Sequence, residues 1–369
     1  MKSVSRHQRY LLTGMISTLV FLWFYLSDNQ AKIETVLRPK CAARTHVVFV
    51  KTHKTASSTV TNIIQRFGLK HHLSFVLPKY PENYLWFDGN AFIDRLLPHP
   101  NGTDKKFDLL CNHAIYNRFA ITKLMYNNTA YITILRHPVN QFLSAFYFYR
   151  TVYKIPYLVR IPGPNPVEEY LKNPAKYEPV SNYASYTNNR MTIDLGIPRL
   201  VFDQPALLTG FINKIDEEFD FVMIMEYFAE SLVLLKRLMC WRMEDIISMR
   251  MNMFKKYEFN MPLKAGMFNS IKKWAHADLE LYEYFYRKFW RRINQMKPDF
   301  WREVEVFKTI QLKVENYCLN LSVSQELLVI DGSEWNERFL VSNQTCKLLN
   351  MNEVKFINYL RTHQQIDVN

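Results

Sequence analysis

The sequence lacks the patterns that mark a structural metal site or a nucleic-acid-binding tract. Its five cysteines contain no CxxC pair and no zinc-finger spacing, so we expect no metal site. No block of five or six like charges occurs, so nucleic acid is not the expected partner. The odd number of cysteines leaves at least one thiol free or bonded to another chain. We expect Cys318 and Cys346 to form a disulfide, because both lie in the polar C-terminal region.

The composition instead indicates a packed core and a preference for anions. Of the 369 residues, 48% are hydrophobic and 15% are aromatic, which is typical of a globular protein rather than a disordered one. The formal net charge of +13 favours an anionic partner, such as a phosphorylated cofactor or an acidic membrane surface. A merely solvated positive surface is the alternative at this point.

The N-terminal residues have the pattern of a membrane anchor. Residues 11–26 carry no charge, with Lys2, Arg6 and Arg9 before them and Asp28 after them. Sixteen residues in a helix span roughly 24 Å, which suits a thin early-secretory bilayer. A cleaved signal peptide is the alternative, but no small-x-small cleavage site follows directly. The positive flank predicts, in order, a cytosolic tail (1–10), a transmembrane signal anchor (11–26), a stem (27–44) and a lumenal domain (45–369).

Four Asn-x-Ser/Thr sequons are consistent with a lumenal domain. The predicted glycosylation sites are Asn101, Asn127, Asn320 and Asn343. Their number is close to what chance provides in a chain rich in asparagine, so they support the lumenal prediction only together with the anchor.

Short apolar segments alternate with helical patterns along the predicted lumenal domain. The strand candidates are residues 46–50, 108–111, 131–135 and 219–225. Helices are predicted from Thr59 onward and at 139–149, 228–238 and 278–296. This alternation predicts an α/β fold with a P-loop-like parallel sheet flanked by helices.

The loop after the first strand candidate has the composition of a phosphate-binding loop. His53 and Lys54 precede the small residues Thr55, Ala56, Ser57, Ser58 and Thr59, at the start of a predicted helix. Free N–H groups at a helix start attract anions, and small side chains let phosphate approach the backbone. The loop contains no glycine, so it is not the GxxxxGK loop of a P-loop kinase or NTPase. A simple helix cap on a surface loop is the alternative.

A second anion site is predicted at the end of the third strand candidate. Arg136 ends this strand and Ser144 lies eight residues later, two turns along the next helix. Together they can hold a phosphate, and ligands of open α/β sheets bind at such strand ends. Two phosphate sites imply a cofactor with two separated phosphate groups, which is the form of 3′-phosphoadenosine 5′-phosphosulfate (PAPS). Taken singly, Arg136 could be a salt-bridge residue and Ser144 a surface serine.

Several segments together resemble the galactose 3-O-sulfotransferase family, which includes the galactosylceramide sulfotransferases. They read HKTASSTVTNI, LLCNHAIYN, ITILRHPVNQFLSAFYFY, DLG and MEYFAESLVLLKRLMCW, and the resemblance runs from about His46 to Trp290. It implies a sulfotransferase fold and transfer of sulfate from PAPS to a hydroxyl, expected to be the 3-OH, of a terminal β-galactose on glycolipid or glycoprotein. By position it implies that residues 54–59 bind the 5′-phosphosulfate and that Arg136 and Ser144 bind the 3′-phosphate. With the predicted anchor, it implies a single-pass type II protein of the Golgi membrane.

His113, just beyond the second strand candidate, is the predicted catalytic base. Histidine has a suitable pKa, and strand ends place it near the edge that carries Lys54, which is predicted to stabilise the departing nucleotide. The rival bases are His53 and His137. The acceptor-binding candidates are Asn112, Asn188, Asn189 and Asp194. Glu226, in the MEYF segment, is as well explained by a structural role as by a functional one.

Two other functions stay open. The loop is also similar to that of the uronyl 2-O-sulfotransferases, so a glycosaminoglycan acceptor is the neighbouring alternative. A non-catalytic membrane protein that binds PAPS or carbohydrate is the alternative from another class. The joint presence of Lys54, His113, Arg136 and Ser144 favours an enzyme.

Overall fold

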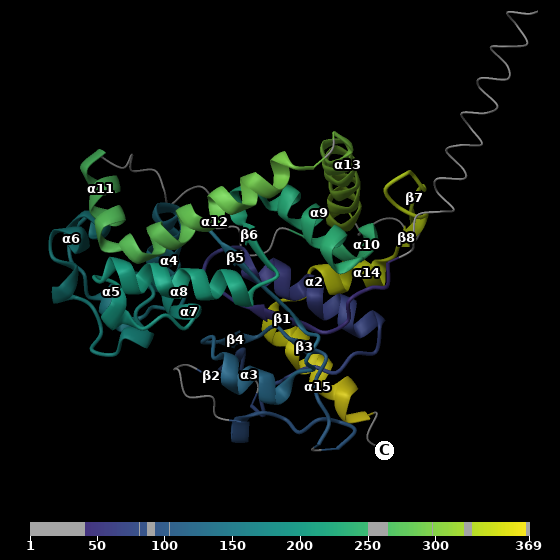
Figure 1. Cartoon of the computed structure of the whole chain (residues 1–369), viewed down its shortest axis with the longest axis horizontal. Helices are drawn as coiled ribbons and strands as arrows, with labels where there is room; N and C mark the ends of the chain where they lie inside the picture. The colour runs from purple at the N-terminus through teal and green to yellow at the C-terminus, as the bar shows by residue number, and fades with distance from the viewer. Residues whose placement is uncertain are drawn as a thin grey trace, which may run out of the picture. The chain divides into compact units, whose positions relative to one another are not determined.

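The computed structural model describes residues 41–80, 82–86, 93–102, 104–249, 265–296, 298–320 and 327–366 (Figure 1). The chain divides into the units Met1–Ala43 and Arg44–Asn369, and the fold described below is that of the second unit. The predicted tail and anchor, and most of the predicted stem, lie outside the described residues. Among the described helices, none is both long enough and apolar enough to cross a bilayer.

A four-stranded parallel sheet forms the centre of the fold. Its strands, in spatial order, are β3 (Leu109–Leu110), β1 (Val47–Val50), β5 (Ala130–Leu135) and β6 (Phe221–Ile224). All three neighbouring pairs run parallel. Every residue of these strands is buried, because helices cover both faces of the sheet. The prediction of an α/β fold with a parallel sheet is therefore confirmed. Three of its four strands lie within their predicted segments, and β5 begins one residue before its own.

The helices follow the strands as the sequence pattern predicts. The four predicted helices correspond to α2 (Ser57–Lys70), α4 (Pro138–Thr151), α9 (Phe228–Met239) and α12 (His276–Asn294). Pro138 is the first residue of α4, where its missing N–H leaves no bond unmade. The remaining helices are α3 (Arg118–Leu124), α5 (Pro156–Val159), α6 (Pro166–Lys172), α7 (Arg190–Asp194), α8 (Pro205–Glu218), α10 (Met243–Ile246), α11 (Ala265–Trp274), α13 (Asp299–Leu319), α14 (Asn343–Leu349) and α15 (Glu353–Ile366).

Two smaller sheets and a second apolar cluster complete the described fold. β2 (Tyr84–Trp86) pairs in parallel with β4 (His113–Ala114), and β7 (Leu328–Ile330) pairs antiparallel with β8 (Phe339–Val341). Helices α4, α5, α6 and α11 lie together on one side in Figure 1 and share an apolar cluster that includes Phe146 and Tyr170. The short strands β2 and β4 were not predicted, and β4 carries His113.

The C-terminal segment packs against α2, the helix that follows the predicted phosphate loop. Figure 1 shows α14 and α15, in yellow, beside α2, and both contact it. The disulfide between Cys318 and Cys346 joins α13 to α14 and confirms the predicted pair. Cys111 is a buried free thiol, which is one of the two outcomes that the odd cysteine count allows, and Cys41 and Cys240 are disulfide-bonded. The four sequon asparagines, at positions 101, 127, 320 and 343, are all exposed.

Candidate active site

The carboxyl ends of β1 and β5 bring the two predicted anion sites into direct contact. Arg136, which follows β5, donates from Nη1 to the carbonyl oxygen of Lys54 at 3.1 Å. Gln141, on α4, donates to the carbonyl oxygen of His53 at 3.1 Å. Thr52 donates from its hydroxyl to the carbonyl oxygen of Ile134 in β5. The loop after β1 is thus held by the neighbouring strand and by the helix that follows that strand.

The loop makes its tight turns without glycine. Lys54 has φ 62° and Ala56 has φ 66°, so two residues with side chains adopt the left-handed conformation. Such residues cost roughly 1 kcal/mol or more each and occur mainly at functional sites. Ala56 is the N-cap of α2, and the first turn of α2 contains no acidic residue. The positive end of the helix therefore has no acidic side chain of its own first turn to compensate it.

Lys51 precedes this loop and Lys54 lies within it, and their side chains have different surroundings. Lys51 directly follows β1 and is 1% exposed, with Nζ 3.3 Å from Ser57 Oγ and 3.1 Å from Ser58 Oγ. Lys54 lies with Nζ 3.3 Å from the ring centroid of Phe148. Burial, and then the charges of Arg136 and Lys51, lower the pKa of Lys54 to about 7. Lys51 was not among the residues predicted from the sequence. Its position directly after an apolar strand was the signal that could have identified it.

His53 belongs to a buried charged cluster. Asp194 accepts from the backbone N–H of His53 at 2.8 Å, and His53 Nδ1 lies 2.8 Å from Asp194 Oδ2. His53 Nε2 lies 2.9 Å from the hydroxyl oxygen of Tyr84. Arg190 donates to Asp194 Oδ1 at 2.7 Å, so the carboxylate is paired on both sides. Both ring nitrogens of His53 therefore have partners within the protein, unlike the nitrogen of a catalytic base, which must be available to accept a proton.

The charges in this cluster determine its protonation. Burial, and then the positive charge of Arg190, lower the pKa of His53 to about 4, against the opposing effect of Asp194. Burial opposes ionisation of Asp194, but Arg190 and His53 hold the pKa of its carboxyl below the usual value. At neutral pH the cluster thus contains a neutral imidazole between a carboxylate and a phenol. Asp194 was predicted as an acceptor residue, and the structure places its carboxylate against His53 and Arg190.

His113 stacks on this cluster and keeps one nitrogen free. Its ring centroid lies 4.2 Å from that of His53 and 4.8 Å from that of Tyr84. Burial, followed by the charge of His53, lowers the pKa of His113 well below its ordinary value, so the ring is neutral at pH 7. Nδ1 of His113 and both amide atoms of Asn112 are buried without a hydrogen-bond partner among the described residues. Such orphaned buried groups are rare, and a ligand that supplies partners would complete them.

The remaining predicted residues differ in whether their polar atoms have partners among the described residues. Arg136 Nε is another buried atom without a partner among the described residues, and Ser144 lies half-buried along α4. Glu226 accepts from the backbone N–H of His137 at 2.9 Å and from the hydroxyl of Tyr282 at 3.2 Å, so it ties the end of β6 to α4. The ring of His137 packs edge-on against Tyr282.

Asn188 and Asn189 are buried and bonded within the protein. Both amides donate to the carbonyl oxygen of Trp274, at 3.4 and 3.3 Å, and Asn189 Oδ1 accepts from the backbone N–H of Asp278 at 2.9 Å. These contacts tie the segment before α7 to α11 and α12. Of the three asparagines predicted to bind the acceptor, Asn112 is the one whose amide stays unpartnered among the described residues.

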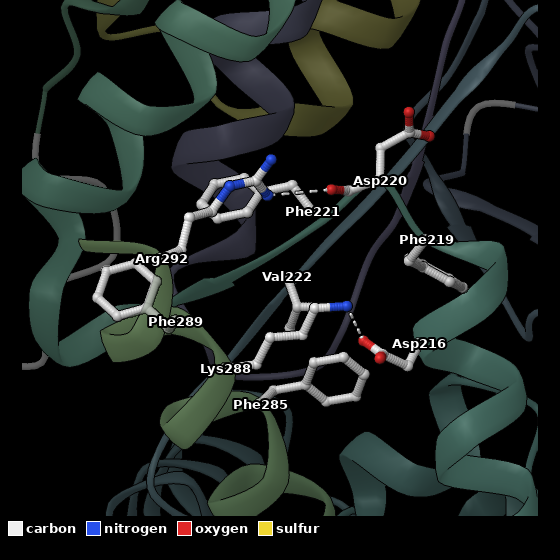
Figure 2. A pocket seen from close by; sticks show the side chains of 9 residues that line it. All are labelled: Asp216, Phe219, Asp220, Phe221, Val222, Phe285, Lys288, Phe289 and Arg292. Carbon is white, nitrogen blue, oxygen red and sulfur yellow. Dashed lines mark hydrogen bonds and ion pairs between the residues drawn. The ribbon is translucent and has the colours of Figure 1, made fainter. Parts of the chain in front are cut away.

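A pocket at the opposite edge of the sheet is too small for a nucleotide. Figure 2 shows it at the amino end of β6, between Phe221, Phe285 and Phe289, with an ion pair between Lys288 and Asp216. Its cavity of about 20 Å³ is close to the space of a single water molecule. The unpartnered buried atoms of Asn112, His113 and Arg136 lie instead just after the carboxyl ends of β3 and β5.

Comparison with known proteins identifies the family. The family model for galactose-3-O-sulfotransferase matches residues 16–330. Human galactosylceramide sulfotransferase is 31% identical over 318 residues, which cover 84% of this chain and 74% of the relative. The bovine protein of the same name is 31% identical over 295 residues, covering 79% and 68%. Pig galactose-3-O-sulfotransferase 2 is 32% identical over 316 residues, covering 84% and 75%. The chain therefore belongs to the galactose-3-O-sulfotransferase family.

Proposed function

We propose that this protein transfers the sulfuryl group of PAPS to a hydroxyl, the 3-OH, of a terminal β-galactose on a glycolipid or glycoprotein. The observation that carries the proposal is the meeting of a lysine-containing loop, Arg136 and His113, whose Nδ1 has no partner among the described residues, at one edge of the sheet. The printed names of the relatives, galactosylceramide sulfotransferase and galactose-3-O-sulfotransferase, support galactose as the acceptor sugar.

The residues at this edge fit a donor with two anionic ends. Lys54 and the small residues 55–59 stand at the positive end of α2, where they suit the 5′-phosphosulfate. Arg136 has a buried Nε without a partner among the described residues and, with Ser144, suits the 3′-phosphate. When bound, PAPS supplies the sulfuryl group and a nucleotide leaving group. Lys54 supplies the positive charge that the leaving phosphate needs, since such transfers depend mainly on positioning and charge stabilisation.

His113 is the proposed general base. Because its ring is neutral at pH 7 and Nδ1 has no partner among the described residues, this nitrogen can accept the proton of the sugar hydroxyl. The rings of His53 and Tyr84 each stack against the ring of His113, with centroids 4.2 and 4.8 Å away, and hold it in place. Asn112, directly before it in the chain, has an amide without partners among the described residues, and this amide can orient the sugar.

The proposed location is the Golgi membrane, with a type II anchor at 11–26 and the catalytic domain in the lumen. Its support is the sequence pattern of the anchor and the exposure of all four sequon asparagines. Sensitivity of the protein in cells to an N-glycosidase, with resistance to alkaline carbonate extraction, tests both parts. A protein that is unglycosylated and released by carbonate would contradict this location.

The activity is tested with purified protein, labelled PAPS and a panel of acceptors. We expect transfer to β-galactosides, and loss of transfer in His113→Ala with retained binding of 3′-phosphoadenosine 5′-phosphate (PAP), the desulfated product. His137→Ala is the matched comparison, because this histidine is half-buried and packs on Tyr282. It should retain turnover. Transfer to heparan or chondroitin but to no galactoside would overturn the proposed acceptor, and full activity of Lys54→Ala would overturn the loop assignment.

A further inference from the structure

A residue from the C-terminal segment reaches the base of the phosphate loop. Glu353 is the first residue of α15, and the family model ends at residue 330, before this helix begins. Its side chain is 13% exposed, and Oε2 lies 3.3 Å from Lys51 Nζ. The same oxygen accepts from the hydroxyl of Ser58 at 3.3 Å. The carboxylate therefore contacts the residues at both ends of the loop, although it comes from the far end of the chain.

These contacts complete a closed set of polar groups around Lys51. Its ammonium group carries three N–H donors, and three acceptors surround it, namely Ser57 Oγ, Ser58 Oγ and Glu353 Oε2. Lys51 is therefore fully used within the protein, which leaves Lys54 as the loop lysine available to an anion. Glu353 Oε1 is buried without a partner among the described residues, so Oε2 alone makes the contacts to the loop.

The carboxylate also supports the charge of Lys51. Burial lowers the pKa of Lys51, and the charge of Glu353 and its hydrogen bond are the largest effects that raise it again. An ammonium group at 1% exposure is costly unless it is paired, so the pair explains how a positive charge persists there. Without it, Lys51 would tend to lose its proton, and its hydrogen bonds to the two serines would weaken.

The position of Glu353 is fixed by the packing of its segment on α2. Asn62, on α2, donates to the carbonyl oxygen of Leu348 at the end of α14 at 2.9 Å. Farther along, the side chain of Gln364 accepts from the backbone N–H of Phe75 at 2.9 Å and donates to its carbonyl oxygen at 3.0 Å. The disulfide from Cys346 to Cys318 anchors α14 to α13. Glu353 is thus held between fixed points on both sides.

We infer that Glu353 is a positioning residue of the donor site, which acts through Lys51 and Ser58 to hold the phosphate loop in its binding conformation. The inference rests on the proposed function of the loop as the donor site. It extends that site beyond the segment that the family model matches, to the C-terminal helix. A purely structural alternative is that an acidic residue in the first turn of α15 only stabilises its own helix. In that case, the effect of replacing Glu353 on PAP binding would be the same with and without Lys51.

The test is a double-mutant cycle with PAP as the probe. We expect Glu353→Ala to weaken PAP binding roughly tenfold or more, as the loss of a charge-assisted contact implies. Glu353→Gln should weaken it less, because its amide oxygen still accepts. In a Lys51→Met background, Glu353→Ala should have little further effect. Lys355→Ala, an exposed residue two positions along the same helix, is the matched control and should bind PAP like the original protein.

Two further readouts separate positioning from loss of folding. The apparent KM for PAPS should rise more than kcat falls, and thermal unfolding of Glu353→Gln should stay cooperative. Because Glu353 supports the charge of Lys51, affinity for PAP should decline at a lower pH in Glu353→Gln than in the original protein.

The inference is overturned if Glu353→Ala binds PAP within about twofold of the original protein, which is under 0.5 kcal/mol. It is also overturned if the effect is equally large with and without Lys51. Either result would leave the proposed function standing, since the original protein would still bind PAP and transfer sulfate. If the original protein does not bind PAP at all, the proposed function itself fails and this inference fails with it.

Discussion

The two edges of the central sheet hold their charged residues in opposite ways. At the carboxyl edge, the charged residues Lys51, Arg190 and Asp194 are each no more than 3% exposed. At the amino edge, Arg44 and Asp220 pair at 2.9 Å with side chains 37% and 35% exposed. Figure 2 shows the same edge at β6, where Lys288 pairs with Asp216 at the surface.

This difference indicates where the fold tolerates an energetic cost. An exposed ion pair contributes about 0–1 kcal/mol, whereas a buried charge costs several kcal/mol unless its partners are complete. At the carboxyl edge the partners are supplied from α7, α15 and the loop itself, so the charges there can persist. Lys51 and the Arg190–Asp194 pair therefore place buried charge at the edge that carries the proposed donor site. If the contrast is energetic, variants at the two edges should differ in the free energy of unfolding. If it is functional, they should differ in their binding of PAP.

The largest expected effect follows from removing Asp194. Asp194→Ala leaves the guanidinium of Arg190 and the backbone N–H of His53 buried without their acceptor. Breaking a buried pair from one side costs about 3–5 kcal/mol, so we expect that loss in the free energy of unfolding, measured by urea denaturation. Asp216→Ala, which breaks the more exposed pair with Lys288 and the hydrogen bond from the hydroxyl of Tyr284, is the matched control and should cost about 1 kcal/mol. Equal losses in the two variants would contradict the contrast between the edges.

The same contrast explains how much of the site could be predicted. The loop residues 53–59, Arg136 and Ser144 follow strand patterns in local sequence, so their place at one edge could be predicted from the parallel sheet. The partner of His53 lies 141 residues away and that of Ser58 lies 295 residues away. Such contacts cannot be predicted from local sequence, because they depend on how α7 and α15 pack. Asp194 was noticed in the DLG motif, but its role as the partner of His53 required the structure.

The next prediction concerns the pH dependence of PAP binding through Lys54. Its pKa is lowered to about 7 by burial, Arg136 and Lys51, so the free side chain is charged below this pH and neutral above it. A bound phosphate raises this pKa, so binding takes up a proton above pH 7. We expect the affinity for PAP to fall by up to about tenfold per pH unit from pH 7 upward, as measured by calorimetry. Lys54→Arg, which stays charged, should show a flat profile over pH 7–9. A flat profile in the original protein would contradict the role of Lys54.

The smallest expected effect concerns Phe148, whose ring centroid lies 3.3 Å from Lys54 Nζ. Phe148→Leu keeps an apolar side chain but removes the ring face, which stabilises a nearby ammonium by about 0.5–1 kcal/mol. Loss of this attraction lowers the pKa of Lys54 further, so the fall in PAP affinity should begin about half a pH unit lower. The matched control is Phe119→Leu on α3, where Lys123 Nζ lies 3.9 Å from a ring that is 71% exposed. That variant should leave the profile unchanged, since α3 leads into the amino end of β5. If both variants shift the profile equally, or if neither does, the contact at the carboxyl edge does not tune the charge of Lys54.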